Sequence, residues 1–560
     1  MSHIKSVTSH GLASVRSRTG DHIHQILSNR SEVRHVDAKD AVDDADLLKQ
    51  IGYKQELNRR YSTIQVFGIA FSIMGLLPSI VSTLAIGYEA GPAALVWGWL
   101  ISGIFILSVG VSMSILSSAI PTSGGLFYWT NYFCPDSVRV PLSFIIGCSN
   151  TLALAGGFCS INYGFASEIL AAVYINAEGD FDITNPKLYG IFAAAIVSQV
   201  IICCLTTSHT AKLQTFSIFI NCFIILLFFI AVPVGAGKGA GFNSASFIFT
   251  ELDNERSWTT GWSFMLSWLP SVWTIGAFDS CLHLSEEAKN ASKSIPWGIC
   301  GSIVTCWVLG WFICIVFTAC IKDGDVEAVL SSDTGSVGAQ IIYDALGKDW
   351  AVAFMALIAF AQYLMGASIL VATSRQAWAF ARDDGLPVVH NIVKKVNPKL
   401  KVPINATIFC GCFSLIIGLL ILINATAANA LFSLGIAGNY LAWAMPPFLV
   451  LLPFGASKFS PGPFYFGNFK TRAIHTVTCV WAAFIIILCM FPDNKEVEKD
   501  TMNYTIAING GVWLIAFIYY FVYGYKKYSG PKSNLDSEDV ESSDDTAAVN
   551  IDEVLGEKES

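Results

Sequence analysis

Long apolar runs alternate with short polar stretches along most of this 560-residue chain. Each run has about 20 residues or more, the length that an α-helix needs to cross the hydrocarbon core of a membrane. The runs lie near residues 63–87, 93–116, 142–174, 188–206, 213–234, 262–282, 296–321, 351–379, 403–423, 428–453, 473–492 and 506–524. The pattern predicts an all-α polytopic membrane protein with twelve transmembrane helices and both termini on one side.

The first and the sixth runs contain residues that interrupt a helix. The first holds Gly68, Ser72, Gly75 and Pro78 close together, and the sixth holds the segment Trp273–Ser280. Lipid cannot satisfy unpaired N–H and C=O groups, so a break must face protein or a cavity. A pair of breaks at corresponding positions of two halves indicates a transporter binding site. Glycine and proline also serve as simple kinks or close-packing points, which is the structural alternative.

We expect a substrate to lie between these two breaks. An unwound segment around Ser72–Gly75 would bind a carboxylate with its exposed N–H groups and an ammonium with its exposed carbonyl groups. The candidate substrate-binding residues are Ser72, Ile73, Met74, Gly75, Thr274, Ile275, Gly276, Phe278 and Asp279.

Asp279 stands out because it is an acidic residue deep in a run and beside a break. A carboxylate in that position costs several kcal/mol by insertion scales, so it should face a cavity and serve a purpose. It either pairs with a cationic group of the substrate or carries a proton. The alternative is a helix-end carboxylate held by Ser280 or His283. Trp273 and Phe278 flank the second break and are either gate residues or ordinary packing.

The composition agrees with a membrane protein. Hydrophobic residues make up 53% of the chain and charged residues 14%, against about 25% charged residues in soluble domains. Cysteines lie mostly within the apolar runs and lack metal-ligand spacing, so they are interpreted as packing residues, and no metal or cofactor is expected. The segment Gly235–Gly241 lacks the residue order of a phosphate-binding loop. No catalytic constellation, ATP-binding domain or nucleic-acid motif is visible, so a gradient must drive any transport.

Charge patterning predicts the orientation and the domain limits. Lys and Arg are concentrated in loops on the side of the termini, as in residues 394–401, which places both termini in the cytoplasm. Residues 1–60 form an N-terminal tail without a cleavable signal peptide, and 61–528 form the transmembrane domain. Residues 529–560 form an acidic tail predicted to be disordered. The tails suit ubiquitination, phosphorylation or trafficking machinery, or they only solubilise. The plasma membrane is favoured over the vacuolar membrane.

Other polar positions are interpreted more simply. Glu168 is expected at the membrane interface, and the segment 285–296 is expected to be a solvated loop, with an inner-gate role as the alternative. Several polar residues within the runs are interpreted as interhelical hydrogen bonds. They are Asn150, Asn162, Asn221, Gln362, Ser368 and Asn439.

Six segments together resemble a known family. They are Gly52–Ser62, Gly68–Gly75, Ile120–Trp129, Trp273–Cys281, Ser285–Lys289 and Phe380–Pro387. The chain resembles the amino acid–choline transporter branch of the amino acid–polyamine–organocation superfamily, and within it the fungal GABA-specific permeases. The resemblance implies a LeuT-like fold, in which spans 1–5 and 6–10 form inverted repeats and spans 11 and 12 are appended. Asp279 takes the place of a glutamate found in many relatives.

The resemblance also implies a function. It indicates a secondary active transporter that imports 4-aminobutyrate (GABA) or a closely related amino acid by alternating access. Proton coupling is implied by the fungal kinship, because the fifth span lacks the lysine that some bacterial relatives use. Asp279 is the proton-coupling candidate. The alternatives are a choline, polyamine or general amino acid permease, or a non-transporting nutrient receptor on the same fold.

Overall fold

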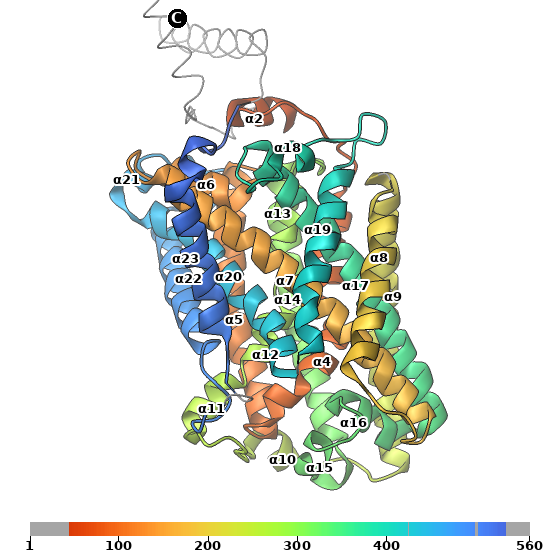
Figure 1. The fold of residues 1–560 in the computed structure, drawn as a ribbon. Coiled ribbons are helices and arrows are strands. Elements are labelled where there is room, and N and C mark those ends of the chain that lie inside the picture. Colours follow the sequence, from red (N-terminus) through yellow and green to blue (C-terminus); the bar gives the residue numbers. More distant parts are fainter. Residues whose placement is uncertain (1–43, 206, 424, 499–501, 534–560) are drawn as a thin grey trace, which may run out of the picture.

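A computed structural model describes residues 44–533 apart from 206, 424 and 499–501 (Figure 1). The predictions made for residues 1–43 and 534–560 therefore lie outside the described residues. The described part is helical, and its only β-type pairing is an isolated bridge between Tyr61 and Ala288. Eleven of its helices are long and apolar enough to cross a membrane. The predicted all-α membrane class is confirmed.

The long elements follow the predicted runs with shifts of a few residues. They are α3 Thr63–Met74, α4 Leu76–Tyr88, α5 Pro92–Ala119, α7 Arg139–Asn176, α8 Asn185–Cys203, α9 Thr207–Lys238, α14 Ala291–Ala319, α17 Lys348–Arg382, α19 Ile404–Ile417, α20 Ala425–Leu451, α22 Asn468–Leu488 and α23 Thr505–Val522. The short helices are α2 Asp44–Ile51, α6 Gly125–Phe133, α10 Ala245–Thr250, α11 Thr260–Leu266, α12 Leu269–Thr274, α13 Ser280–His283, α15 Val326–Leu330, α16 Val337–Leu346, α18 His390–Val393 and α21 Pro453–Ala456. Short 3₁₀ helices cover Lys322–Gly324, Gly418–Leu422 and Gly524–Lys526.

The sixth of the twelve predicted spans is interrupted, as its sequence predicts. The sixth run is not a continuous helix, because it is divided into α11, α12 and α13 with irregular backbone between the last two. If α3 and α4 are counted as one span, eleven spans in the described residues are long enough to cross a membrane. The sixth run consists of short pieces instead. Irregular backbone at membrane depth is tolerated only where protein or a cavity surrounds it.

Local sequence explains how the first span begins. Ser62 is the N-cap of α3, its side chain accepts from the N–H of Gln65, and the Gln65 side chain accepts from the N–H of Ser62 at 3.0 Å. This reciprocal capping box fixes where α3 starts. The span then runs from α3 through Gly75 into α4, and 83% of its apolar stretch is buried.

The order of elements repeats once. A broken helix opens each half, α3 with α4 in the first and α12 with α13 in the second, and four long helices follow each break. Equivalent helices of the two halves pack against each other, α5 along α14 and α7 along α17 (Figure 1). The last two helices, α22 and α23, pack on the outside of this 5+5 core, against α5, α7 and α20. This arrangement is the predicted inverted-repeat fold.

Two tryptophans mark the pseudosymmetry between α5 and α14. Nε1 of Trp99 donates to the carbonyl of Trp307, and Nε1 of Trp307 donates to the carbonyl of Leu100, both at 2.9 Å. Each indole lies over a glycine of the opposite helix, Gly310 and Gly103, where an added Cβ would come within 2.1 Å and 2.0 Å of an indole atom. Small residues let helix backbones approach closely, as is common in membranes.

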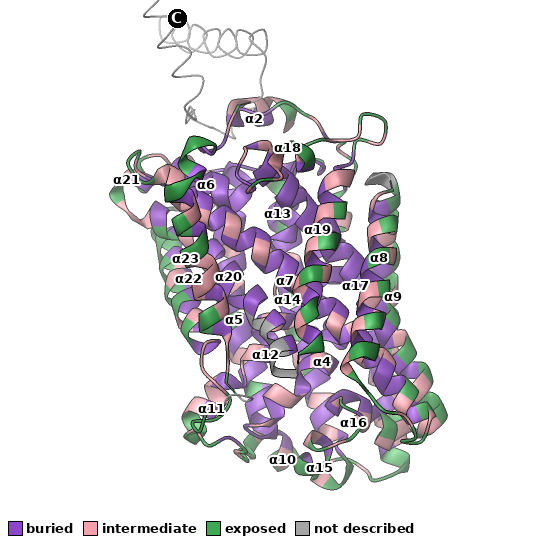
Figure 2. Cartoon of the chain, in the orientation of Figure 1, coloured by how far each residue is buried: buried purple, intermediate pink, exposed green. Residues whose placement is uncertain are grey.

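Burial separates the core helices from the lipid-facing ones. Figure 2 shows burial concentrated on the central helices and exposure along α8, α9, α22 and α23. The apolar stretches of α7 and α17 are each 78% buried, whereas the apolar stretch of α23 is 22% buried. The exposed positions on the outer helices are apolar, such as Phe219, Leu226 and Ile515. These helices therefore present the surface that a bilayer would cover.

The two ends of the bundle differ. The described ends of the chain, together with α2, α6, α13 and α18, lie at one end, called the tail end (Figure 1). The helices α10, α11, α15 and α16 lie at the opposite end (Figure 1). The breaks of the first and sixth spans lie between the two ends, inside the core.

Candidate functional site

The first break is a single residue wide. α3 continues through Met74, Gly75 adopts φ 41° and ψ 60°, and α4 begins at Leu76. The predicted unwinding over Ser72–Gly75 is therefore too long, because Ser72 is still helical. A Cβ at Gly75 would lie 2.6 Å from Sδ of Met365 on α17, so both the left-handed backbone and the packing require glycine. α4 starts without a side-chain cap, which leaves the first N–H groups of its N-terminus for another partner.

The second break is wider. α12 ends at Thr274 and α13 starts at Ser280, which leaves Ile275–Asp279 outside regular helix. Ala277 adopts the left-handed conformation at φ 54°. The carbonyl of Ser271 still accepts from the N–H of Ile275, but the carbonyls that follow it in α12 lose their intrahelical partners because the helix stops there. The predicted break around Gly276 is present, and the residue that turns the chain is Ala277.

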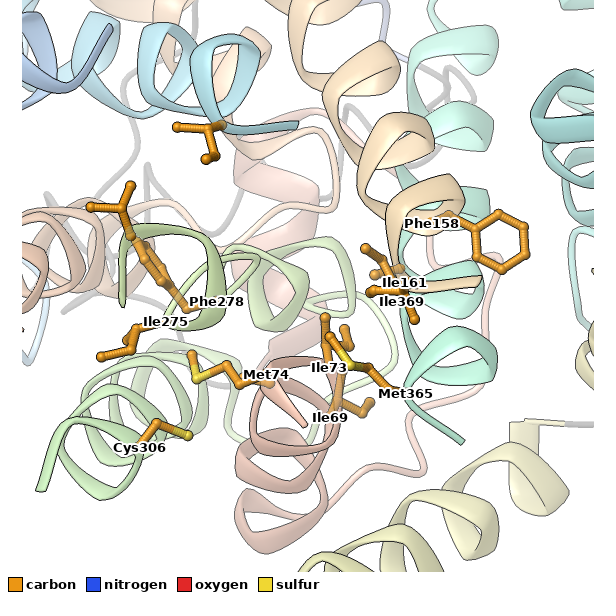
Figure 3. Packing of buried hydrophobic residues seen from close by; sticks show 14 of the residues in the cluster. Ile69, Ile73, Met74, Phe158, Ile161, Ile275, Phe278, Cys306, Met365 and Ile369 are labelled. Carbon is orange, nitrogen blue, oxygen red and sulfur yellow. The ribbon is translucent and has the colours of Figure 1, made fainter. Parts of the chain in front are cut away.

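The structure brings the two breaks together. Ile73, Met74, Ile275 and Phe278 belong to one buried cluster, and Figure 3 shows Met74 extending toward Ile275 and Phe278, while Ile73 lies beside Met365. The two broken spans also share a hydrogen bond, because Sγ of Cys281 on α13 donates to the carbonyl of Val66 on α3 at 3.3 Å. The candidate residues predicted from two distant segments thus line one region.

Several polar atoms in this region are buried and have no hydrogen-bond partner within the described protein, and three of them belong to predicted substrate-binding residues. These three are Oγ of Ser72, Oγ1 of Thr274 and Oδ1 of Asp279. Buried polar groups in native proteins are nearly always hydrogen-bonded, and each exception calls for an explanation such as a ligand. All three atoms belong to residues that the sequence had marked as candidates. The arrangement can bind a small polar molecule.

Asp279 is held on one side by amides. Its Oδ2 accepts from Nδ2 of Asn150 on α7 at 3.0 Å, and the same Nδ2 lies 3.1 Å from Oδ1 of Asn439 on α20. Nε2 of His283 lies 3.5 Å from Oδ2, and all these side chains are buried. Oδ1 has no hydrogen-bond partner among the described residues and is therefore the oxygen available to a ligand.

Two aromatic groups flank the second break. Trp273 packs edge-on against Phe432 of α20 at 4.9 Å between ring centroids, and Phe432 in turn contacts Tyr163 of α7 at 6.1 Å. Phe278 lies 4.4 Å from the ring of Trp443 on α20. Both predicted gate residues therefore pack against rings of helix α20, which belongs to a different part of the core than α12 and α13.

Buried ion pairs close the tail end. Oε1 of Glu287 accepts from Nε of Arg375 at 2.8 Å, and Oε2 of Glu286 accepts from Nη1 of Arg382 at 3.0 Å. Both glutamates are fully buried. The interpretation of 285–296 as a solvated loop is therefore wrong for its first residues, because α17 covers them and supplies their counter-charges. The inner-gate alternative fits this geometry.

The segment before α3 packs against the residues that flank Glu286 and Glu287. Nη1 of Arg59 donates to the carbonyls of Ser285 and Ala288 at 3.1 Å and 2.9 Å. Asp44 accepts from the N–H groups of Asn290 and Ala291 at 2.7 Å and 2.9 Å, and so caps the start of α14. Residues 44–60, expected as part of a tail, thus hold the segment between α13 and α14.

The C-terminal segment joins the same surface. Asp383, at the end of α17, accepts from the hydroxyl of Tyr53 at 2.9 Å and from the N–H of Lys532 at 3.3 Å. Burial raises the pKa of Asp383 to about 7, an effect that Arg382 and the Tyr53 hydroxyl oppose. The neighbouring Asp384 accepts from Nζ of Lys532 at 2.7 Å.

A separate ion pair ties the opposite end of the two broken spans. Nη2 of Arg256, which precedes α11, lies 2.8 Å from Oε2 of Glu89 at the end of α4. The same nitrogen donates to the carbonyl of Ile86 at 2.8 Å. The candidate site therefore has charged contacts at both ends, and its own residues are buried.

Several functional positions were missed or undervalued in the sequence. Asn150 and Asn439 do form an interhelical hydrogen bond with each other, as predicted, but Asn150 also donates to the carboxylate of Asp279. Glu168 is buried rather than interfacial, and its Oε1 accepts from the hydroxyl of Ser82 on α4 at 3.2 Å. Only polarity within an apolar run signalled these positions, and that signal does not reveal the partner. His283 was considered only as a helix-end donor.

Comparisons with known proteins agree with this geometry. Residues 61–512 match the family model described as amino acid permease. A GABA-specific permease of Saccharomyces cerevisiae is 52% identical over 531 residues, covering 94% of this chain and 91% of that protein. Two uncharacterized amino-acid permeases of Schizosaccharomyces pombe are 32% and 33% identical, and the alignments cover 91% and 88% of this chain and 92% and 90% of the relatives.

Proposed function

Because this chain belongs to the amino acid permease family, we propose that it imports GABA or a closely related amino acid together with protons, by alternating access. It is an integral, multi-pass membrane transporter and not an enzyme. The name of the yeast relative supports GABA as the substrate. The observation that carries the proposal is the group of three unpaired buried polar atoms, on Ser72, Thr274 and Asp279, between two helix breaks.

Both ends of GABA have a matching partner. The N-terminus of α4 offers N–H groups and the positive end of a helix dipole, so it binds the carboxylate. Oδ1 of Asp279 and the last carbonyls of α12 are acceptors, so they bind the ammonium. The hydroxyls of Ser72 and Thr274 can add hydrogen bonds to either group. Choline and polyamines lack a carboxylate for the α4 terminus, which favours a zwitterion.

Alternating access would use the charged contacts at the two ends. We place the tail end in the cytoplasm, as the Lys and Arg distribution predicts. The pairs of Glu286 and Glu287 with the arginines of α17 then form the inner closure, and Arg256 with Glu89 forms the outer one. Trp273 and Phe278 act as gates, because each packs against α20 from an opposite side of the break.

The plasma membrane is the proposed location, with lipid covering the apolar outer helices. Trafficking or ubiquitin machinery is the proposed partner of the tails. A fluorescent fusion distinguishes the plasma membrane from the vacuolar membrane.

Uptake of labelled GABA in a permease-deficient yeast tests the function. We expect saturable uptake that a protonophore abolishes. No saturable uptake would contradict the substrate, and uptake that is indifferent to the protonophore would contradict the coupling. Surface expression without any flux of GABA, choline, putrescine or neutral amino acids would favour the nutrient receptor.

A further inference from the structure

His283 faces two oxygen atoms from opposite sides of its ring. Nδ1 lies 3.0 Å from the carbonyl oxygen of Ser123, in the loop before α6, and Nε2 lies 3.5 Å from Oδ2 of Asp279. The ring is fully buried, and Nε2 has no hydrogen-bond partner among the described residues. The histidine thus connects the site carboxylate with the loop that precedes α6.

These contacts determine where the protons are. A carbonyl oxygen only accepts, so Nδ1 must carry the hydrogen that joins His283 to Ser123. If Asp279 is ionised and His283 is neutral, the lone pair of Nε2 faces a carboxylate, and two acceptors lie against each other in a dry environment. One additional proton removes this conflict, either on Nε2 or on Oδ2. The geometry therefore needs one exchangeable proton between Asp279 and His283.

The elements packed against α13 carry other ionisable side chains. The sequence of α3, which packs against α13, has no ionisable side chain, and the nearest side chains from α7 and α20 are the amides of Asn150 and Asn439. Cys281 donates to the carbonyl of Val66. On α14, Cys300 contacts Ser114, and the other ionisable groups are Lys293, Cys306 and Cys314. On α17, Arg375 and Arg382 are paired with glutamates, Lys348 with Glu178 and Tyr363 with Ser198, and Asp349 is exposed.

We propose that Asp279 and His283 together form the binding site for the co-transported proton. This inference rests on the proposed function and assigns its proton to a pair of residues. The proton binds between Oδ2 and Nε2 without forming a bond to the substrate, while Oδ1 stays free for the ammonium. With the proton on Nε2, the Asp279 carboxylate keeps its negative charge, so the protonated imidazole and the ammonium can lie at its two different oxygens.

A short connection links this pair to the inner closure. The carbonyl of Ser123 accepts from His283, and the N–H of the same residue donates to Oε1 of Glu286 at 3.4 Å. Glu286 pairs with Arg382. Loss of the proton places the lone pair of Nε2 against the carboxylate, and the two groups repel each other. His283 is bonded to Ser123, which also donates to Glu286 of the inner closure, so the repulsion acts on this connection. Release of the proton therefore favours opening of the tail end.

The test measures protons moved per GABA with the full-length chain in liposomes that contain a pH-sensitive dye. Wild type should acidify the lumen when GABA enters. In His283→Gln, which cannot titrate, the ratio of protons to GABA should fall to near zero in whatever GABA flux remains. His475→Gln is the matched control, because His475 is also buried but its hydrogen bond within the described part of the chain is to the hydroxyl of Ser112, at 2.7 Å, and not to a carboxylate. Its ratio should stay at the wild-type value.

The outcomes separate this inference from the proposed function. A wild-type ratio in His283→Gln would overturn the inference, whereas GABA entry without acidification in wild type would overturn proton coupling itself. If His283→Gln does not fold, infrared difference spectra of wild type with ring-labelled histidine replace it, with His475→Gln for assignment. A GABA-dependent change in an imidazole band that persists in His475→Gln supports the pair, and no change contradicts it.

Discussion

Glu287 and Arg375 form an ion pair of 2.8 Å in which both side chains are fully buried. They come from segments 88 residues apart in the sequence, so the contact joins the end of the broken sixth span to α17. Removing one partner of a buried pair leaves an uncompensated charge, which costs about 3–5 kcal/mol. We therefore expect Glu287→Gln to lower the melting temperature in detergent by several degrees.

An exposed pair provides the control for that experiment. Lys348 and Glu178 lie 2.6 Å apart, but their side chains are 34% and 73% exposed. An exposed pair contributes about 0–1 kcal/mol, so Glu178→Gln should change the melting temperature little. Equal effects of the two substitutions would contradict the role of the buried pair in closing the tail end.

Gly75→Ala should abolish transport. Alanine at φ 41° is strained by about 1–2 kcal/mol, and its Cβ would contact Met365 of α17. Since Gly75 sits between α3 and α4, the strain moves the N–H groups proposed to bind the carboxylate. Uptake in cells with matched surface expression measures the effect. Gly190→Ala on α8 is the control, because nothing lies within 4 Å of its Cβ position and its uptake should be normal.

Features that depend on neighbouring residues could be predicted from the sequence, whereas features that depend on contacts between distant residues could not. Runs of apolar residues and the glycine and proline in the first span are local, and they located the helices and the first break. The buried ion pairs at the tail end join residues that lie far apart in the sequence. The pair of Glu286 with Arg382 joins residues 96 positions apart, and a Glu–Glu sequence near lysines reads as a solvated loop.

The same reasoning explains the candidate site. Asp279 was predictable because an acidic residue in an apolar run is costly. Its partner Asn150 comes from α7 and is itself bonded to Asn439 of α20, and a single amide in a helix gives no indication of which carboxylate it binds. The break in the sixth span was expected at Gly276, but the left-handed residue is Ala277, and alanine does not favour this conformation by itself.

Asp279→Asn should cripple GABA uptake while the protein remains folded. The amide preserves the shape of the side chain, but it removes the charge that attracts the ammonium and the site for a proton. Saturable uptake at matched surface expression is the measurement, with Asp349→Asn, an exposed position at the start of α17, as the control. Unchanged kinetics in Asp279→Asn would remove this carboxylate from the site.

The stability of the tail end should depend on pH through Asp383. Its pKa is raised from 3.8 to about 7 because burial disfavours the carboxylate. The folded chain keeps a proton that the unfolded chain releases, so this contribution to the free energy of unfolding is fully present below about pH 4 and is lost as the pH rises through 7. The melting temperature of Asp383→Asn should fall less between pH 5.5 and 7.5 than that of wild type. Identical slopes would contradict this assignment.

The central claim is that this chain carries GABA between the two broken helices. The most direct measurement is uptake of labelled GABA by the purified full-length protein in liposomes loaded with unlabelled GABA, in competition with choline, putrescine and neutral α-amino acids. We expect saturable exchange that excess GABA inhibits strongly and that choline and putrescine leave unchanged. Absence of GABA exchange in liposomes that exchange choline, putrescine or another amino acid would contradict it.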